Sequence, residues 1–304
     1  MRVVFLGTGG TYPSKKRNVS SVTTQIGPDV VMFDCGEGTQ RQLTISPVSF
    51  MRIRAVFFTH LHADHFLGLP GLIQSMSLNG RTEALQVFGP DKTIETVRDM
   101  LNLGHFRSQF DVIAKELAPG ENIDLGSFNV SVAEASHNVP SLAFAVEEEP
   151  RRGRFDIQRA KELGIPAGPK YRDLQEGRPV TVDGRTIQPQ DVIGQERSGR
   201  KMVYSGDTRP CQSVTEMAAG ADMLIHDGTL DSTHARLADE FGHSTAAQAA
   251  KVAKDAGVAT LYLTHISPRY DDDSVLLAEA RSVFPHSVVA HDLDVVEIRY
   301  RKPG

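Results

Sequence analysis

The chain is poor in cysteine, in long hydrophobic runs and in net positive charge, and each shortage excludes a class of protein. Two cysteines among 304 residues cannot build a disulfide framework, so the sequence suits a reducing compartment and we expect a cytoplasmic protein. No apolar run approaches the roughly 18 residues of a membrane span, so we expect no membrane partner. The first residues, MRVVFLGTGGTYPS, lack the apolar core and cleavage site of a signal peptide. The net charge of −5 argues against the basic surface that is typical of nucleic-acid-binding proteins.

One segment departs from this acidic average. Residues 151–178 hold eight basic and four acidic residues, a local charge of +4 that leaves −9 for the rest of the chain. They lie in a longer stretch, 147–190, which is rich in proline, glycine and charge and in which we expect one short helix at 156–163. A run of charge is commonly only a solvated face, but a long excursion inside a compact domain is either disordered or functional. We therefore predict a single domain over 1–304 with an insertion at 147–190.

Short β-type runs alternate with helical patterns in the rest of the chain. The apolar runs predict strands at 3–6, 19–26, 30–33, 55–59, 128–135, 141–146, 201–205, 221–226, 260–264 and 287–290. Helical periodicity predicts helices at 65–79, 91–103, 244–257 and 271–284. This order of strands and helices predicts a layered α/β fold with sheets inside and helices outside.

The strongest chemical signal is THLHADH, at the end of the apolar run AVFFT. It places His60, His62, Asp64 and His65 within six positions. Alternate side chains of an extended chain face the same way, so the first three are expected on one side, with His65 opening the next helix. Imidazole nitrogens and carboxylate oxygens are ligands of zinc, and a catalytic zinc keeps one position open for water. The alternative is a polar loop that happens to be rich in histidine.

Other histidines and aspartates also follow apolar strands. VAEAS precedes His137, KMVYSG precedes Asp207 and TLYLT precedes His265, while Asp34 and Asp227 are placed in the same way. Polar groups at strand ends meet at one edge of a sandwich, where rigid backbone can hold them near a metal. Seven ligands are too many for one zinc and suit two with a bridging carboxylate, an arrangement of metals about 3.5–4 Å apart that hydrolyses phosphoesters. The seven candidates are His60, His62, Asp64, His65, His137, Asp207 and His265.

With these residues in this order, the sequence resembles the metallo-β-lactamase superfamily and, within it, the tRNase Z (ribonuclease Z) family in its short form. The motifs FLGTGG, FDCGEGTQRQ, YSGDTRP and GHSTAAQAA extend the likeness along nearly the whole chain. The resemblance implies a four-layer αβ/βα sandwich with an inserted flexible arm. It also implies two zinc ions per subunit, with Mn²⁺ or another divalent ion as the alternative. The ligand sets that it implies are His60, His62 and His137 for the first ion, Asp64, His65 and His265 for the second, and Asp207 as the bridge.

The resemblance implies a zinc-dependent endoribonuclease that removes 3′ trailers from precursor tRNA. The products would be a tRNA with a 3′-OH and a trailer with a 5′-phosphate. Asp64 is expected to orient the attacking water and accept its proton, and His243, steered by Asp227, is expected to protonate the leaving 3′-oxygen. Asp34 is expected to position ligands without binding metal.

The sequence departs from the family pattern at two places. Ala63 stands where the family usually has glycine, which keeps the residue small. HDGT at 226–229 replaces the family's His-Glu-Ala-Thr, so the carboxylate of Asp227 is one methylene shorter and its role in proton transfer is less certain than that of His243.

Two further motifs separate this family from its hydrolase relatives. PSKKRN at 13–18 fits the Pro-x-Lys-x-Arg-Asn loop, which by resemblance helps to read the tRNA 3′ end and disfavours a mature CCA. GIPAGP at 164–169 resembles the Gly-Pro motif of the arm that grips the tRNA elbow. The resemblance also implies a homodimer in which the arm of one subunit holds tRNA for the site of the other. The substrate-binding residues that it implies are Pro13, Lys15, Arg17, Asn18, Gly168 and Pro169.

Two other readings compete with this one. A small-molecule hydrolase of the same fold, such as a glyoxalase-type thioesterase or a cyclic phosphodiesterase, would share the metal ligands. Such an enzyme would not need the Pro-x-Lys-x-Arg-Asn loop or the basic Gly-Pro arm. A non-catalytic RNA-binding relative would be expected to have lost ligands, whereas all seven are present. Longer RNA-processing relatives with an inserted second domain need more chain than 304 residues.

Overall fold

A computed structural model describes residues 1–301, so the last three residues of the predicted 1–304 domain lie outside the described residues. The chain divides into two compact units. Unit 1 comprises Met1–Glu147 and the chain from Arg200 onward, and unit 2 is Glu148–Gly199. In unit 1, Glu147 pairs with Lys201 on neighbouring antiparallel strands, so the chain leaves and re-enters this unit at adjacent positions. No helix among residues 1–301 is both long enough and apolar enough to cross a bilayer.

Two mixed sheets form the centre of unit 1. Within residues 1–301 the first sheet has seven strands, in the order β16 (Val295–Glu297), β1 (Arg2–Gly7), β2 (Ser21–Ile26), β3 (Asp29–Phe33), β4 (Ile53–Phe57), β5 (Leu85–Gly89) and β6 (Val112–Glu116). The second sheet, over the same residues, has the order β15 (Ser287–Val289), β14 (Leu261–Thr264), β13 (Met223–Asp227), β12 (Lys201–Tyr204), β9 (Ser141–Glu148), β8 (Phe128–Ala135) and β7 (Asn122–Asp124).

The sheets face each other across an aromatic core. Phe33 and Phe57 of the first sheet contact Phe144 of the second, with ring centroids 5.7 and 5.3 Å apart. Strands β3 to β6 run parallel, as do β12 to β15. Parallel strands are covered on both faces, which explains why they read as continuous apolar runs in the sequence.

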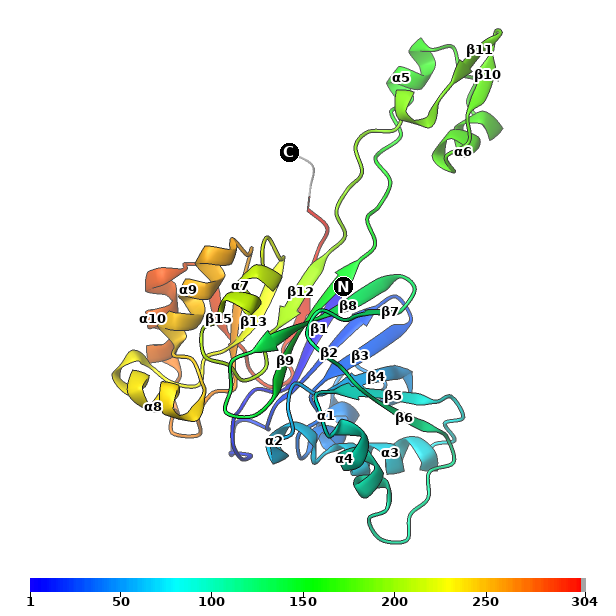
Figure 1. Ribbon diagram of the computed structural model, residues 1–304. Coiled ribbons are helices and arrows are strands. Elements are labelled where there is room, and N and C mark those ends of the chain that lie inside the picture. Colours follow the sequence, from blue (N-terminus) through cyan, green and yellow to red (C-terminus); the bar gives the residue numbers. More distant parts are fainter. Residues whose placement is uncertain (302–304) are drawn as a thin grey trace. The chain divides into compact units, whose positions relative to one another are not determined.

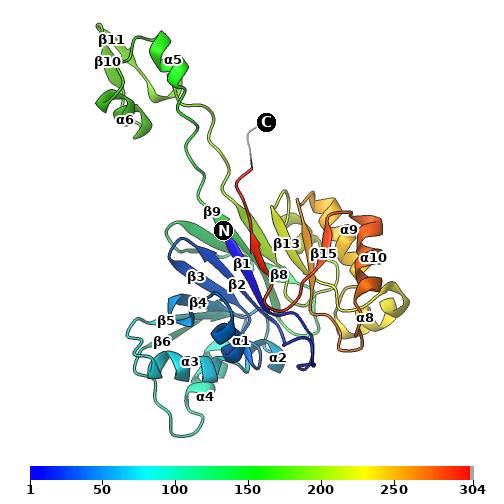
Figure 2. The same cartoon turned by 180° about the vertical axis from the view of Figure 1, so that it is seen from behind.

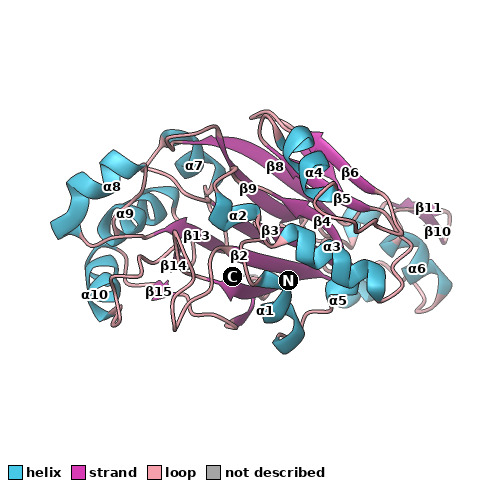
Figure 3. Cartoon of the chain, turned by 90° about the horizontal axis from the view of Figure 1, so that it is seen from below, coloured by secondary structure: helices cyan, strands magenta, loops and turns pink. Residues whose placement is uncertain are grey.

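Helices cover the two outer faces of the sandwich (Figures 1 and 3). On the first sheet lie α1 (Thr39–Ile45), α3 (Leu69–Leu78) and α4 (Thr93–Leu101), which share an apolar cluster with β1, β3, β4 and β5. On the second lie α7 (Gln212–Met217), α9 (Ala246–Ala256) and α10 (Ser274–Val283). The view from behind shows the same four layers (Figure 2), and the predicted four-layer sandwich is confirmed. The remaining elements of unit 1 are α2 (Ala63–Phe66), α8 (Ala235–Phe241), and the 3₁₀ helices Phe50–Arg52 and Ser232–His234.

The helix predicted at 65–79 is interrupted at Gly68. A Cβ at this position would lie 2.1 Å from the carbonyl oxygen of Gly36, and the Gly68 amide donates to the carbonyl of Cys35 at 2.8 Å. This close backbone approach separates α2 from α3. Strands β5 and β6 were not predicted, although LQVFG has the apolar content of a strand.

Unit 2 has a small core of its own. It contains α5 (Ile157–Glu162), α6 (Pro169–Gln175), a 3₁₀ helix at Pro189–Asp191 and the hairpin of β10 (Val180–Val182) with β11 (Arg185–Ile187). The hairpin turns through Asp183 and Gly184, whose φ angles of 47° and 76° fit a type I′ turn. The predicted short helix is present as α5, whereas α6 and the hairpin were not predicted. The buried side chains of this core are Ala160, Ile165, Leu174, Val180, Val182, Ile187 and Val192.

Candidate active site

The predicted metal ligands gather at one end of the strands of unit 1. His60 and His62 follow β4, and Asp64 and His65 lie on α2, while the other three follow β8, β12 and β14. The ligand atoms of Asp207 and His265 lie within 4.8 Å of those of Asp227 and His243, and the seven predicted ligands among themselves form three overlapping groups of the same kind. These groups are His60 with His62 and His137; His60 with His65 and Asp207; and Asp64 with His65 and His265.

The first group is made of imidazoles alone. His62 Nδ1 lies 3.0 Å from His60 Nε2 and 3.3 Å from His137 Nε2. Two nitrogens bound to one tetrahedral zinc at about 2.0–2.1 Å would be about 3.3 Å apart, so the spacing fits a single ion. His62 is exposed and His137 is half-buried, so this side of the cluster is open to solvent.

Asp207 lies between the groups. Its Oδ2 is 3.7 Å from His60 Nε2, 3.3 Å from His65 Nε2 and 3.1 Å from His265 Nε2. Asp64 Oδ2 faces the same interior, 3.6 Å from His65 Nε2 and 3.4 Å from His265 Nε2. A carboxylate that reaches imidazoles of both groups occupies the position from which two ions could be bridged.

The outer ring nitrogens of four histidines each have a fixed partner. His65 Nδ1 contacts Asp34 Oδ2 at 2.8 Å, and His137 Nδ1 contacts the Gly242 carbonyl at 2.7 Å. His60 Nδ1 and His265 Nδ1 contact threonine hydroxyls at 3.0 and 2.9 Å. Such outer partners orient metal-binding imidazoles and leave the Nε2 atoms facing the cluster.

His65 Nε2 gives the sharpest test of whether a metal fits. Within residues 1–301 this buried nitrogen makes no hydrogen bond of acceptable geometry, although carboxylate oxygens lie nearby. A buried polar atom without a partner calls for an explanation, and a missing ion supplies one. The cluster is therefore a candidate centre for a divalent metal.

The charges of the cluster also suit a metal. Burial lowers the pKa of His60 well below 6.5, and burial likewise lowers the pKa of His62 and His137. Burial opposes the charge on Asp207, but His265 and His65 outweigh it and hold its pKa well below 3.8. At His65 burial again opposes the charge, but Asp207 and Asp34 outweigh it and raise the pKa of this imidazole well above 6.5. Neutral imidazoles and ionised carboxylates are the forms that bind metals, so a cation bound at His65 would take the place of a proton.

Asp34 contacts the cluster from the buried side. Its carboxylate is fully buried and accepts hydrogen bonds from the Thr59 amide at 2.8 Å and the Tyr204 hydroxyl at 2.9 Å, besides its contact with His65. Its φ of 57° lies in the left-handed region, which a residue other than glycine seldom adopts. Burial and the charge of Asp34 raise the pKa of Tyr204 well above 10, so the phenol remains a donor.

His243 and Asp227 form a dyad beside the cluster. His243 Nδ1 lies 2.8 Å from Asp227 Oδ2, and its ring centroid is 4.9 Å from that of His265. Burial disfavours the charged imidazole, but Asp227 outweighs burial and raises the pKa of His243 to about 9. A protonated imidazole at the edge of the cluster can act as a general acid. The shorter carboxylate of Asp227 thus still reaches its histidine.

The loop at 13–18 divides into a buried part and an exposed part. Arg17 is only 7% exposed, and its guanidinium donates to Thr8 Oγ1 at 2.6 Å and to the Ala290 carbonyl, and pairs with Asp273. The backbone N–H of Asn18 donates to a carboxylate oxygen of Asp292 at 2.6 Å. The side chains of Pro13 and Lys15, in contrast, are exposed. Thr11, two residues before this loop, contacts the cluster, because its backbone N–H donates to Asp64 Oδ2 at 2.8 Å.

Gly168 and Pro169 lie in unit 2, at the start of α6. Gly168 precedes the helix with a φ of 126°, a conformation that favours glycine, and Pro169 occupies the first turn. The motif therefore begins a helix within unit 2.

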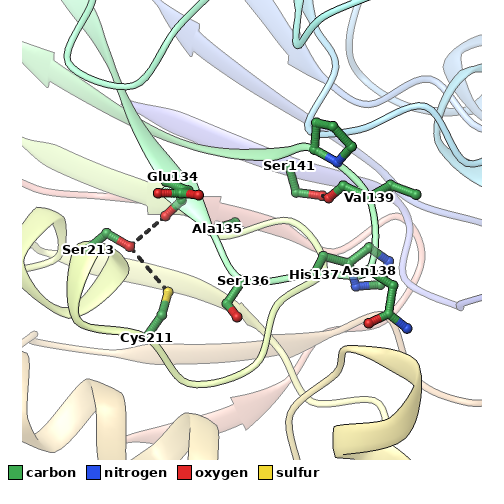
Figure 4. A pocket seen from close by; sticks show the side chains of 10 residues that line it. Glu134, Ala135, Ser136, His137, Asn138, Val139, Ser141, Cys211 and Ser213 are labelled. Atoms are coloured by element: carbon green, nitrogen blue, oxygen red, sulfur yellow. Dashed lines mark hydrogen bonds between the residues drawn. The ribbon is translucent and has the colours of Figure 1, made fainter.

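A pocket of ≈ 530 Å³ lies beside His137 (Figure 4). It is lined by residues 134–141 together with Cys211 and Ser213. Ser213 Oγ donates to the Glu134 carbonyl at 2.6 Å and lies 3.3 Å from Cys211 Sγ. Of the predicted ligands, His137 alone lines this pocket.

Several residues of the site were not predicted. Thr59 and Thr229 contact histidines of the cluster, Tyr204 contacts Asp34, and Thr11 contacts Asp64. The two threonines that touch histidines lie in FFTH and HDGT, next to residues that had been singled out. Their position in these motifs was therefore the only feature of the sequence that could have identified the two threonines as residues of the site.

Comparisons with known proteins show what this chain is similar to. The family model described as "Beta-lactamase superfamily domain" matches residues 30–156 and 174–266. Ribonuclease Z of Methanosarcina mazei is 45% identical over 302 residues, which are 99% of this chain and 99% of that protein. Ribonuclease Z of Methanothermobacter thermautotrophicus is 46% identical over 299 residues, 98% of this chain and 97% of that protein. The crystal structure of human tRNase Z, short form, has a TM-score of 0.72 and 28% identity, covering 98% of this chain and 100% of that one.

Proposed function

The chain belongs to the ribonuclease Z family of the β-lactamase superfamily, and from this membership we propose that it removes 3′ trailers from precursor tRNA as a zinc-dependent endoribonuclease. The observation that carries the proposal is the convergence of seven candidate metal-binding side chains into overlapping groups, with the Asp207 carboxylate near imidazoles of each. The products are a tRNA with a 3′-OH and a trailer with a 5′-phosphate.

We assign two zinc ions to the cluster, with Mn²⁺ or another divalent ion as the alternative. His60, His62 and His137 would hold one ion, Asp64, His65 and His265 would hold the other, and Asp207 would contact both. Bound ions would supply Lewis acidity, which activates water and neutralises charge on a phosphate. The unpartnered Nε2 of His65 and the spacing of the imidazole nitrogens support this assignment.

Asp64 is assigned as the residue that orients the attacking water and accepts its proton. Burial opposes its charge, but a hydrogen bond from His265 and the nearby imidazoles lower its pKa below 3.8, so the carboxylate is ionised at neutral pH. The Thr11 amide holds one of its oxygens in place. An ionised carboxylate held at the edge of the cluster is able to accept a proton.

His243 is assigned as the proton donor to the leaving ribose 3′-oxygen. Its Nδ1 is held by Asp227 at 2.8 Å, which leaves Nε2 free to face a substrate. Its pKa of about 9 keeps the ring protonated at neutral pH. Asp227 acts through His243, as a positioning residue.

Substrate binding is divided between the two units. We assign Pro13 and Lys15 to contact with the tRNA 3′ end, whereas buried Arg17 shapes the loop that presents them. Unit 2 is assigned as the arm that holds the tRNA body, beginning its second helix at Gly168 and Pro169. Within residues 148–199, four exposed cations make neither an ion pair nor a side-chain hydrogen bond and are available to phosphates: Arg154, Lys161, Arg172 and Arg185.

The proposal extends to assembly and location. In a homodimer, the arm of one subunit would hold tRNA for the active site of the other. Gel filtration with light scattering measures the oligomeric state directly. The two cysteines, Cys35 and Cys211, are free thiols, which supports a cytoplasmic location.

Incubation with a 3′-extended tRNA transcript tests the activity. We expect one cut at the boundary of the trailer, loss of cutting after chelation, and recovery on addition of zinc or manganese. Labelling of the product ends should give a 3′-OH on the tRNA and a 5′-phosphate on the trailer. Cutting that survives complete removal of metal would overturn the proposal. Hydrolysis of a glutathione thioester or a cyclic phosphodiester without tRNA cleavage would favour the small-molecule alternative, and metal binding without either activity would favour a non-catalytic relative.

A further inference from the structure

Few aromatic side chains of unit 1 or unit 2 are exposed. Of the 14 phenylalanines and 6 tyrosines, three are more than a third exposed within residues 1–301: Tyr12 at 59%, Phe241 at 56% and Tyr300 at 39%. The guanidinium of Arg200 lies over the ring of Tyr300, 4.1 Å from its centroid. The side chains of Tyr12 and Phe241 make no ring contact and no hydrogen bond within the same residues. A single exposed apolar side chain is ordinary, so the location of these two rings decides whether they have a role.

Tyr12 lies beside the Asp64 end of the cluster. The preceding residue, Thr11, donates its backbone N–H to Asp64 Oδ2 at 2.8 Å. A Cβ on Gly10 would lie 2.4 Å from His265 Cε1, so the backbone at Gly10 lies directly against that imidazole. This exposed ring is therefore one residue from a contact with Asp64 and two from a contact with His265.

The turn that presents Tyr12 is strained. Thr11 has a φ of 70°, and the Tyr12 N–H donates to the Gly10 carbonyl at 2.8 Å, which are the features of the rarer and strained form of γ-turn. Strained backbone of this kind is concentrated at functional sites. The ends of the loop are held together, because the Gly9 N–H donates to the Asn18 carbonyl at 2.8 Å.

A carboxylate fixes the same loop at its base. Asp292 accepts hydrogen bonds from the Thr8 N–H at 3.0 Å and the Thr8 hydroxyl at 2.7 Å, and from the Asn18 N–H at 2.6 Å. These bonds join the start of the loop to its end. A ring on a fixed backbone loses less entropy on binding than a ring on a mobile loop would, so Tyr12 is suited to bind a flat partner.

Phe241 lies beside a different group of candidate ligands. It is the last residue of α8, and the next residue, Gly242, has a φ of 82°. The Gly242 carbonyl contacts His137 Nδ1 at 2.7 Å, and a Cβ on Gly242 would lie 2.6 Å from that nitrogen. His243, the assigned proton donor, follows directly in the sequence. The end of α8 therefore lies against the cluster and carries an exposed ring.

Exposed aromatic rings together with cations are typical of proteins that bind single-stranded nucleic acid, because every unpaired base has a face on which a ring can stack. We propose that Tyr12 and Phe241 are stacking platforms for the two bases that flank the cut, Tyr12 for the first base of the trailer and Phe241 for the last base of the tRNA. The exposed Lys15 in the same loop as Tyr12 supplies the cation. The proposal rests on the proposed function, because it requires RNA as the substrate.

The chemistry of the cut assigns each ring to its side. The leaving 3′-oxygen belongs to the last nucleotide of the tRNA, and its assigned proton donor, His243, lies two residues after Phe241. In an in-line displacement the attacking water approaches opposite the leaving oxygen. Asp64, which is assigned to this water, contacts the residue before Tyr12. The phosphate stays on the trailer, so Tyr12 is assigned to the first base of the trailer.

Removing the ring and removing the base should cause the same loss if the two stack on each other. The substrates are a complete precursor tRNA and one with an abasic first trailer nucleotide. With the complete substrate, we expect Tyr12→Ala to lower kcat/KM by about 5- to 100-fold, the range for one base on an aromatic ring. With the abasic substrate the unsubstituted protein should already show this loss, and Tyr12→Ala should add less than about twofold. Equal losses on both substrates would overturn the role of Tyr12, and so would an abasic nucleotide without effect on the unsubstituted protein.

Phe241→Ala is tested in the same way against an abasic last nucleotide of the tRNA. The crossed combinations, such as Phe241→Ala with the abasic trailer nucleotide, should give additive losses, because each ring has its own base. Coupling of Phe241 to the trailer base and of Tyr12 to the tRNA base would overturn the assignment of the two sides.

Conservative variants separate stacking from packing. Tyr12→Phe and Phe241→Tyr keep an aromatic ring and should stay within about threefold of the unsubstituted protein. Tyr300→Ala is the matched control and should leave kcat/KM unchanged, because this exposed tyrosine lies beyond the start of β1, whereas Gly10 lies beyond its end. Equal losses in Tyr12→Phe and Tyr12→Ala would overturn stacking.

A fluorescent base distinguishes failure of this proposal from failure of the proposed function. 2-Aminopurine replaces the first base of the trailer, and its fluorescence falls when it stacks on a ring. Rapid mixing with the full-length, metal-loaded protein should lower the fluorescence before the cut in the unsubstituted protein and in Tyr12→Phe, but not in Tyr12→Ala. An equal decrease in Tyr12→Ala would overturn the platform even though tRNA is cut. An unsubstituted protein that neither binds nor cuts precursor tRNA would contradict the proposed function, and the platforms with it.

Discussion

Unit 1 and unit 2 place their charged residues in opposite environments. In unit 1, Asp34 and His65 are fully buried and Asp207 is 3% exposed, and each lies within hydrogen-bonding or ion-pairing distance of other members of the cluster. In unit 2, ten basic and nine acidic residues give a net charge of only +1 over 148–199, and the ion pairs are exposed, as between Arg159 and Glu162. Buried charges depend on exact partners, whereas exposed pairs are screened and individually weak.

This contrast teaches how the two units should respond to substitution. A single change in the cluster of unit 1 leaves other buried groups without partners, so its effect should be large. If unit 2 binds tRNA as proposed, a single change there would remove one contact among several with a polyanion, so the effects should be small and additive. The following predictions test this difference, from the largest expected effect to the smallest.

Asp207→Asn should have the largest effect. It removes the charge that faces His60, His65 and His265. Loss of several kcal/mol of transition-state stabilisation corresponds to roughly a 10³-fold lower rate of tRNA cleavage. Metal content measured by mass spectrometry should fall with activity, while tRNA binding measured by gel shift should remain.

Asp231→Asn is the control for this substitution. Asp231 is also buried, but its carboxylate contacts Thr233, His234 and Tyr270, outside the predicted ligands. The control should keep its metal and its activity. An Asp207→Asn protein with full activity would remove Asp207 from the site.

Replacement of residues 149–198 by a short Gly-Ser linker should have the next largest effect. Glu147 and Lys201 are opposite each other on β9 and β12, so about 3–5 residues suffice for the connection. Unit 2 has its own apolar core, so unit 1 should remain folded. Because several phosphate contacts are lost together, kcat/KM for precursor tRNA should fall by roughly 10²-fold, with a weaker salt dependence.

A small phosphodiester separates binding from chemistry in this variant. Its hydrolysis should be unchanged, since the cluster is intact. Unchanged tRNA processing by the shortened protein would show that unit 2 is not the tRNA-binding arm.

Most of the cluster could be predicted because its signals are local. His60, His62, Asp64 and His65 lie within six positions, and strand ends in one sandwich bring the distant ligands to them. The layers could be predicted for the same reason, since parallel buried strands leave continuous apolar runs. The type I′ hairpin of unit 2 was missed even though VDGR is a strong turn signal, because it lies among prolines, glycines and charges.

Other features depend on contacts that the sequence does not reveal. Arg17 matches a substrate-binding motif, yet its guanidinium is paired with Asp273, 256 positions away. No local pattern identifies that partner. The contacts of Thr59 with His60 and of Thr229 with His265 depend on how the strand ends meet in the fold, and threonine next to a strand end is otherwise ordinary.

His243→Ala should have an effect of intermediate size. General acids contribute about 10²–10⁴-fold, and we expect a loss at the lower end, about 10²-fold in the rate of tRNA cleavage, while metal content stays the same. A phosphodiester with a p-nitrophenolate leaving group needs no proton, so its hydrolysis should change little. Loss of metal, or equal losses on both substrates, would show that His243 has another role.

Lys15→Ala should have the smallest effect, and Lys16→Ala is its matched control in the same loop. Both lysines are exposed, but Lys16 Nζ donates to the Asp271 carbonyl at 2.6 Å, whereas Lys15 has no ion pair or side-chain hydrogen bond within residues 1–301. Removing one phosphate contact should lower the slope of log Kd against log salt by about 0.7–0.9, and we expect this for Lys15→Ala. Lys16→Ala should leave the slope nearly unchanged, because its ammonium is already held by the protein. Binding of precursor tRNA over a salt series measures both slopes, and equal changes would mean that the loop contributes charge alone.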